Sequence, residues 1–188
     1  MKKPAILIDL DRCVGCQSCT VVCKMENDVE LGEFWTKVVH MGPYGKFPDL
    51  QMYFMPKLCQ HCEEPSCVDV CPTGASFQRE DGIVLVDHNK CIGCQFCVMA
   101  CPYGVRHLDK RSGVVTKCTL CAHRIDAGEE PICVKSCQQR SRIFGDLDDP
   151  NSEISKKIQA AGDKVYTLTD TGNHPKVRYI LQKADWKG

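Results

Sequence analysis

The chain has 188 residues, of which 24 are Lys or Arg and 24 are Asp or Glu, so its formal net charge at pH 7 is zero. This balance gives no indication of a nucleic-acid partner or of a broad basic face that binds membranes. The length is sufficient for one domain with an ordinary hydrophobic core, or for two small modules that share a core.

Sixteen cysteines distinguish the composition, and all of them fall into four groups of four. In chain order the groups are Cys13, Cys16, Cys19 and Cys23; Cys59, Cys62, Cys67 and Cys71; Cys91, Cys94, Cys97 and Cys101; and Cys118, Cys121, Cys133 and Cys137. An even number of cysteines could form a disulfide framework, but such frameworks belong to smaller secreted scaffolds. The first and third groups instead have the spacing C-x-x-C-x-x-C-x-x-x-C, which is typical of ligands to 4Fe-4S clusters.

The first segment, residues 1–58, is expected to hold the first cysteine group and an insertion. Its start, MKKPAILIDLD, contains a short apolar run that predicts a strand. The run is too short for the core of a signal peptide and there is no twin arginine, so no export signal is expected. Residues 24–58 include the turn-rich stretches GEFWTK and MGPYGKFPD, which predict either a surface loop or a docking surface for a partner.

The central segment, residues 59–110, carries the second and third groups and repeats part of the first segment. Residues 5–23 (AILIDLDRCVGCQSCTVVC) align without gaps on residues 83–101 (IVLVDHNKCIGCQFCVMAC), and the two glycines and two glutamines of the loops coincide. Such similarity marks a duplicated unit. Apolar runs at residues 51–55 and 113–117 precede the second and fourth groups. The pattern predicts four strand-loop-helix units or two ferredoxin-like 4Fe-4S modules, and therefore a loop-rich α+β fold with short strands and helices.

Two segments remain. Residues 111–145 carry the fourth group and are expected to pair with residues 1–30, and residues 146–188 are expected to form a C-terminal α/β tail. Pro150, Asn151 and Ser152 predict the cap of a helix over residues 153–161 that Gly162 ends. Residues 165–169 and 176–181 predict strands, and the tail is expected to pack on the modules without carrying chemistry. The longest run of low polarity, residues 96–105, is far shorter than the roughly 20 residues that a membrane helix needs.

Every group ends in C-x-x-x-C, which places its last two cysteines one helical turn apart on one face. The last cysteine can then bind a different cluster from the first three, as in two-cluster ferredoxins. The second and third groups end in Cys-Pro, whereas the first and fourth do not. This division favours a nested pairing of second with third and first with fourth, although sequential pairing stays open at this stage.

Structural zinc is the main alternative for any group of four cysteines. The fourth group, with eleven residues between Cys121 and Cys133, would pass for a zinc site if it stood alone. The three-residue periodicity of the first and third groups disfavours zinc there. A 3Fe-4S centre is disfavoured because every group has all four cysteines.

Side chains next to the cysteines are expected to influence the clusters. His61 and His123 are expected to donate hydrogen bonds to cluster sulfur or to the backbone. Basic residues that precede first cysteines are expected either to be charge partners of the anionic clusters or to be solvated: Arg12, Lys57, Lys90 and Lys117. An oxidised cluster with its thiolates carries about −2, so four would bring about −8. No catalytic motif is found, and the chain is expected not to be an enzyme by itself.

Over nearly its whole length the chain resembles the four-cluster iron-sulfur subunits of the molybdopterin oxidoreductase, or dimethyl sulfoxide reductase, superfamily. The resemblance rests on CVGCQSCTVVCKMEN, CQHCEEPSCVDVCPTGAS, DGIVLVDHNKCIGCQFCVMACPYGVR and KCTLCAHRIDAGEEPICVKSC, followed by FGDLDDPNSE. The short subunits of polysulfide, thiosulfate, tetrathionate and arsenate reductases are the most similar in these motifs. Nitrate-reductase relatives have a tryptophan where this chain keeps Cys94, so four 4Fe-4S clusters are expected.

The resemblance implies four ligand sets with nested pairing. These sets are Cys13, Cys16, Cys19 and Cys137; Cys23, Cys118, Cys121 and Cys133; Cys59, Cys62, Cys67 and Cys101; and Cys71, Cys91, Cys94 and Cys97.

The resemblance also implies electron transfer between a membrane subunit that reacts with quinone, or a soluble donor, and a large catalytic subunit. That large subunit, not this chain, would hold molybdopterin with molybdenum or tungsten. Anaerobic respiration on the periplasmic side of the cytoplasmic membrane is expected, through co-export with the catalytic subunit, and a cytoplasmic location is the alternative. A free-standing soluble polyferredoxin stays open as a different function, as does a subunit of a cytoplasmic formate dehydrogenase, hydrogenase or phenol-type hydroxyl-transferring enzyme.

Overall fold

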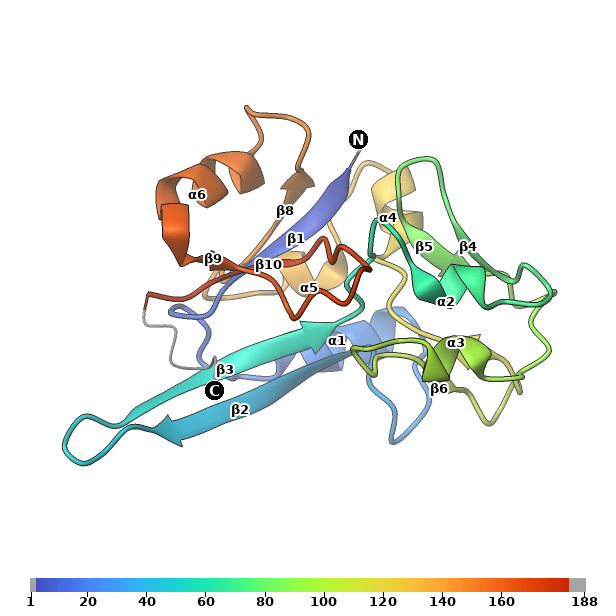
Figure 1. Ribbon diagram of the computed structural model, residues 1–188, viewed down its shortest axis with the longest axis horizontal. Helices are drawn as coiled ribbons and strands as arrows, with labels where there is room; N and C mark the ends of the chain where they lie inside the picture. Colours follow the sequence, from blue (N-terminus) through green and yellow to red (C-terminus); the bar gives the residue numbers. More distant parts are fainter. Residues whose placement is uncertain (1–2, 183–188) are drawn as a thin grey trace.

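The computed structural model describes residues 3–182, which form short strands and helices connected by long loops (Figure 1). The strands are β1 (Pro4–Asp9), β2 (Thr36–Tyr44), β3 (Gln51–Leu58), β4 (Ser76–Gln78), β5 (Val84–Val86), β6 (His107–Leu108), β7 (Val115–Thr116), β8 (Arg142–Asp146), β9 (Val165–Tyr166) and β10 (Arg178–Ile180). The helices are α1 (Ser18–Glu26), α2 (Ser66–Asp69), α3 (Phe96–Met99), α4 (Ala122–Asp126), α5 (Ile132–Lys135), α6 (Glu153–Ala161) and the 3-10 turn η1 (Gly162–Lys164). This content confirms the α+β class.

A four-stranded sheet of order β8-β1-β10-β9 joins the first strand of the chain to the last quarter. β1 is antiparallel to β8 and parallel to β10. Successive side chains of a strand point to opposite faces. Ala5 and Leu7 therefore enter a small core with α6, whereas Ile6 and Ile8 enter the main core. This two-sided burial explains why the sequence of β1 is apolar without alternation.

The C-terminal tail is part of this sheet, and its predicted helix is found at the predicted bounds. The Ser152 hydroxyl caps α6 by accepting a hydrogen bond from the Ser155 backbone N–H at 3.2 Å. The predicted strands are shorter than expected, since β9 ends at Tyr166 and β10 begins at Arg178. The division into four segments at residues 58, 110 and 145 stays a prediction, and residues 183–188 of the tail lie outside the described residues.

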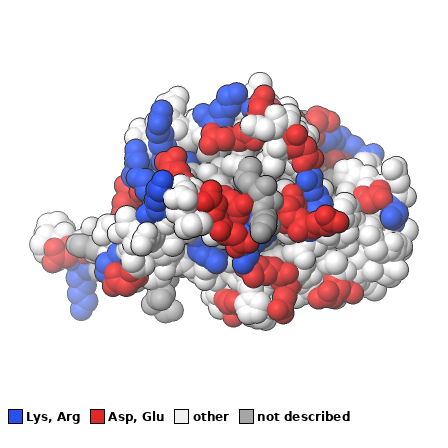
Figure 2. All heavy atoms as spheres, turned by 90° about the horizontal axis from the view of Figure 1, so that it is seen from above, with Lys and Arg blue, Asp and Glu red and all other residues white. Residues whose placement is uncertain are grey.

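The insertion before the second cysteine group is mostly a long antiparallel hairpin of β2 and β3, so the expectation of a loop holds only for residues 27–35 and for the tip. The hairpin projects from the body in both Figure 1 and Figure 2. Phe47, Leu50 and Met52 are exposed at or near its tip. On the face in Figure 2, acidic and basic side chains are interspersed, which agrees with the neutral composition.

The remaining strands form two small hairpins, β4-β5 and β6-β7, close to the short helices α2 and α3 (Figure 1). Within residues 3–182, none of the helices is sufficiently long and apolar to cross a membrane.

Candidate functional site

The structure brings the cysteines together in groups drawn from distant parts of the chain. Three groups each line a cavity, and they are named here site 2 (Cys23, Cys118, Cys121, Cys133), site 3 (Cys59, Cys62, Cys67, Cys101) and site 4 (Cys71, Cys91, Cys94, Cys97). The non-atom space in and around these cavities, open solvent included, is similar at about 290, 330 and 310 Å³, respectively. The cysteines that line each cavity are those that the nested pairing assigns to one set, and their ligation of clusters stays a prediction.

The remaining cysteines form site 1, which consists of Cys13, Cys16, Cys19 and Cys137. Burial raises the pKa of Cys13, and the nearby thiolates of Cys19 and Cys137 raise it further. Hydrogen bonds with Ser18, whose hydroxyl lies 3.4 Å from the Sγ of Cys16, lower the pKa of Cys16, and the Cys137 thiolate opposes this effect. Helix α1 packs on α5, and this contact brings the two ends of the quartet together.

The duplicated cysteine loops have the same backbone conformation. Gly15 and Gly93 both have φ of 67°, and Gln17 and Gln95, which precede α1 and α3, have φ of 63° and 64°. A Cβ at Gly15 would lie 2.5 Å from the ring of Phe54, and one at Gly93 would lie 2.4 Å from the backbone oxygen of Gly113. Glycine is therefore required by the left-handed backbone and by the close approach of a neighbour.

Backbone N–H groups point at several of the cysteine sulfurs. The N–H groups of Ser76, Val115 and Leu120 donate to the Sγ atoms of Cys71, Cys91 and Cys118 at 3.3, 3.4 and 3.4 Å. Hydrogen bonds of this kind favour the thiolate over the thiol, and in iron-sulfur proteins they raise the reduction potential.

Burial opposes ionisation of the inner cysteines. It raises the pKa of Cys23 and Cys62 to about 12 and that of Cys67 to about 11, and nearby thiolates add to the effect. The pKa of Cys118, which is fully buried, is also raised well above its ordinary value. These sulfurs become thiolates only beside strong positive charge, such as a bound metal.

Three buried cations supply part of this positive charge. Arg142 donates to the Sγ of Cys19 at 3.3 Å, and Arg106 donates to the Sγ of Cys67 at 2.9 Å. Lys117, which is 2% exposed, donates to the backbone oxygen of Cys118 at 2.7 Å. Lys117 was expected from the sequence, whereas both arginines were missed.

The other side chains expected to influence the clusters divide into two kinds. His61 is buried, and its Nδ1 accepts a hydrogen bond from the Val84 N–H at 3.1 Å, so the neutral ring carries its proton on Nε2. This Nε2 is buried without a hydrogen-bond partner among residues 3–182, so its expected bond to cluster sulfur or backbone stays a prediction. Arg12 and Lys90 are exposed, and Lys57 lies half-buried on β3, so these three are solvated rather than charge partners.

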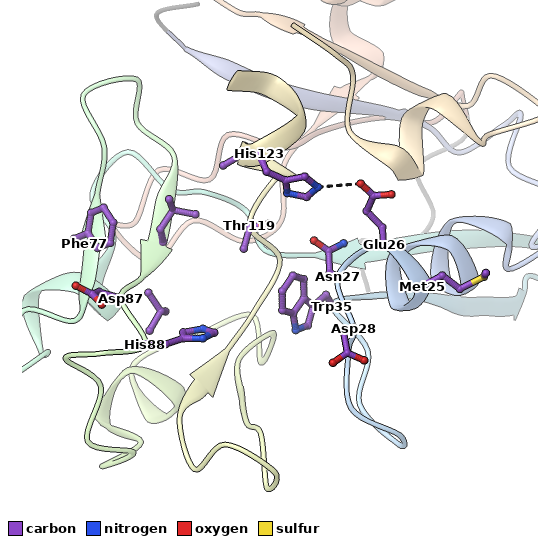
Figure 3. Close-up of a pocket in the computed structure, with 13 residues that line it drawn as sticks. Met25, Glu26, Asn27, Asp28, Trp35, Phe77, Asp87, His88, Thr119 and His123 are labelled. Carbon is purple, nitrogen blue, oxygen red and sulfur yellow. Dashed lines mark hydrogen bonds and ion pairs between the residues drawn. The ribbon is translucent and has the colours of Figure 1, made fainter. Parts of the chain in front are cut away.

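His123 does not have the expected role as a donor to sulfur or backbone. It pairs instead with Glu26, with 2.9 Å between its Nε2 and the carboxylate, at the edge of an open groove of about 680 Å³ (Figure 3). Figure 3 shows Trp35 and Asn27 facing the same groove from the side of α1.

The arrangement of the cysteines fits a group larger than a single ion. Among residues 3–182, no three Cys, His, Asp or Glu side chains are placed to hold one metal ion. Four sulfurs that line one cavity match the all-cysteine ligation of a 4Fe-4S cluster. Three buried polar atoms at the sites have no hydrogen-bond partner among residues 3–182. These atoms are the Nη1 of Arg106, the Nη1 of Arg142 and the Oγ1 of Thr119.

Comparison with known proteins agrees with this chemistry. The chain matches a 4Fe-4S dicluster domain over residues 50–147, and a second domain of the same description over residues 12–75. It is 45% identical to a tetrathionate reductase subunit of Salmonella typhimurium, with 94% of this chain and 71% of the relative aligned. It is 42% identical to a sulfite dehydrogenase subunit of Allochromatium vinosum, with 97% and 85% aligned. It is also 47% identical to the thiosulfate reductase electron transfer subunit of Salmonella typhi, with 81% and 80% aligned.

Proposed function

The chain belongs to the family of 4Fe-4S dicluster iron-sulfur subunits of reductase complexes, and on this basis we propose that it binds four 4Fe-4S clusters and relays electrons to or from a molybdopterin catalytic subunit. As in its relatives, its role is electron transfer without catalysis of its own. The proposed second partner is a membrane subunit that reacts with quinone, or a soluble donor.

The observation that carries this proposal is the arrangement of the four sites in a row. Cys19 of site 1 and Cys133 of site 2 are electrostatic neighbours. Cys118 of site 2 and Cys59 of site 3 are also neighbours. A cluster bound at each site would accept and release one electron. Sites 3 and 4 share a charged neighbour, Arg106, which acts on Cys67 and on Cys97. The order 1-2-3-4 then gives a path through the protein.

Both ends of the row reach the surface, as a relay between two partners requires. Cys16 of site 1 and Cys94 of site 4 are exposed, whereas Cys23, Cys118, Cys121 and Cys133 of site 2 are all buried. Exposed apolar side chains lie in the same loops: Val14 beside site 1, and Ile92, which is 68% exposed, beside site 4. Apolar patches of this kind are typical of protein interfaces.

The proposed location is the periplasmic side of the cytoplasmic membrane, reached with a catalytic subunit that carries the export signal. Fractionation of the native host tests this point. Recovery with the cytoplasmic fraction would instead support the cytoplasmic alternative.

Anaerobic purification from the native host tests the function. We expect about sixteen irons per chain, EPR signals from four reduced centres, and a co-purifying large chain that contains molybdopterin in a fixed ratio. A colourless protein, or substantially fewer irons after reconstitution, would refute the four clusters. A stable monomer with all four centres would instead indicate a free-standing polyferredoxin.

A further inference from the structure

A buried cation lies at each junction between consecutive sites. The Arg142 guanidinium donates to the Sγ of Cys19 of site 1 at 3.3 Å, and it is also an electrostatic neighbour of Cys133 of site 2. We propose that Arg142, Lys117 and Arg106 are junction cations, each of which places one positive charge between two neighbouring clusters and raises the reduction potential of both. This inference rests on the proposed function for the presence of the four clusters.

The second arginine repeats the arrangement in the other half of the protein. Arg106 donates to the Sγ of Cys67 of site 3 at 2.9 Å, and it is also an electrostatic neighbour of Cys97 of site 4. Each arginine also donates to a buried hydroxyl, Arg106 to Ser76 at 3.0 Å and Arg142 to Thr36 at 2.8 Å. The two arginines each stand five residues after the last cysteine of their group, the third group for Arg106 and the fourth for Arg142.

Lys117 occupies the junction between the two halves. Its Nζ donates to the backbone oxygens of Val84 and of Cys118, the latter a residue of site 2. Burial lowers the pKa of Lys117 and the nearby charge of Arg106 adds to this effect, whereas the thiolates of Cys59 and Cys67 of site 3 favour its charged form. The row therefore alternates between groups of thiolates and single cations.

The surroundings of these cations indicate that their counter-ions are the clusters. Arg142 is 3% exposed, Lys117 is 2% exposed and Arg106 is 5% exposed. None of the three forms an ion pair with a carboxylate within residues 3–182. A buried charge without a counter-ion is strongly unfavourable. The Nη1 atoms of both arginines are also buried without a hydrogen-bond partner among the described residues. The sulfur ligands, and the anionic clusters that they would hold, are the negative charges in contact.

A shared cation has a consequence for electron transfer. Reduction adds a negative charge to a site, and a positive charge at the junction stabilises that charge on either side of it. The cation also reduces the repulsion between electrons on neighbouring sites. Removal of a junction cation should therefore change the reduction potentials of two clusters, whereas replacement of one cysteine ligand acts mainly on the potential of one cluster.

The test is an EPR-monitored redox titration of the full chain, isolated anaerobically with its co-purifying partner, for the variants Arg142→Gln, Lys117→Gln and Arg106→Gln. We expect Arg142→Gln to disfavour reduction of two of the four centres by about tenfold or more, which is about 59 mV per electron. Arg106→Gln should shift the other two centres. Lys117→Gln should shift one centre from each pair, so the pattern needs no prior assignment of signals.

Two controls separate charge from packing. Arg142→Lys keeps the charge and should leave the four potentials close to those of the parent. Arg178→Gln removes a partly buried arginine whose main charged neighbour is Glu63 rather than a cysteine, and it should shift none of them. If a glutamine variant does not accumulate with iron, the methionine variant replaces it, since methionine leaves no polar group unpaired. If neither accumulates, Arg142→Lys must still retain all four centres, and their loss would overturn the proposal.

Shifts that are equal at all four centres, or that fall on the same two centres for both arginines, would also overturn it. So would the absence of any shift. Failure of the proposed function is a different result, because it appears as fewer than four centres in the parent protein.

Discussion

Replacing Gly93 by alanine should damage site 4 more than the same change at Gly15 damages site 1. Both glycines lie in a C-x-G-C loop with φ of 67°. A left-handed backbone costs a residue with a Cβ about 1–2 kcal/mol. This first contribution is equal for the two positions, so any difference must come from what the new methyl group meets.

The neighbours of the two glycines differ in how easily they can move. At Gly93 the methyl carbon would lie 2.4 Å from the backbone oxygen of Gly113, which is fixed by the β6-β7 turn. Overpacking of this kind costs about 1–3 kcal/mol, so the total for Gly93→Ala is about 2–5 kcal/mol. At Gly15 the methyl would meet the half-buried ring of Phe54, which can rotate. The total cost of Gly15→Ala should therefore stay close to the cost of the left-handed backbone alone.

The assay compares the apparent Tm of the two variants at one scan rate, together with the EPR intensity of each centre. One kcal/mol corresponds to about 2–4 °C for a chain of this size, so we expect Gly93→Ala to lower Tm by about 4–20 °C and Gly15→Ala by less. Only Gly93→Ala should reduce the intensity of the site 4 centre. Equal losses of Tm and of signal in the two variants would refute this reasoning, and recovery of Gly15→Ala by Phe54→Leu would support it.

Three further outcomes are expected. Cys23→Ser should remove or alter the centre at site 2 and leave site 1 intact, as read by EPR; a change at site 1 alone would contradict the nested pairing. Ile154→Ala should lower stability by about 2–5 kcal/mol, because Ile154 of α6 is fully buried in the small core between α6 and the sheet, and it should leave the iron content unchanged. Ser152→Ala should cost about 0.5–2 kcal/mol through loss of the α6 cap, and an unchanged Tm would show that the cap contributes nothing.

Local patterns explain which features could be predicted from the sequence. The cap and the terminal glycine of α6 are set by neighbouring residues, so the helix was predicted at its observed bounds. The duplicated loops could be recognised because the same glycine and glutamine positions impose the same positive φ values.

Features that depend on distant contacts could not be predicted in this way. Arg106 and Arg142 lie outside the cysteine loops, and only the tertiary structure places them against sulfur. Their equal spacing from the preceding cysteine was the available signal. His123 was expected to face sulfur or backbone because it follows Cys121 closely, but Glu26 from α1 holds it at the surface.

The central place of β1 means that this sheet cannot be completed until the ribosome has synthesised residues 178–180. β1 precedes all of its partners in the chain, and both of its hydrogen-bonding edges are filled by strands encoded after residue 141. An interrupted translation product that ends before Arg178 would keep an apolar edge open, which is a known hazard for aggregation. The topology thus distinguishes whole chains from fragments, and fragments are expected to be removed by quality control before they reach a partner.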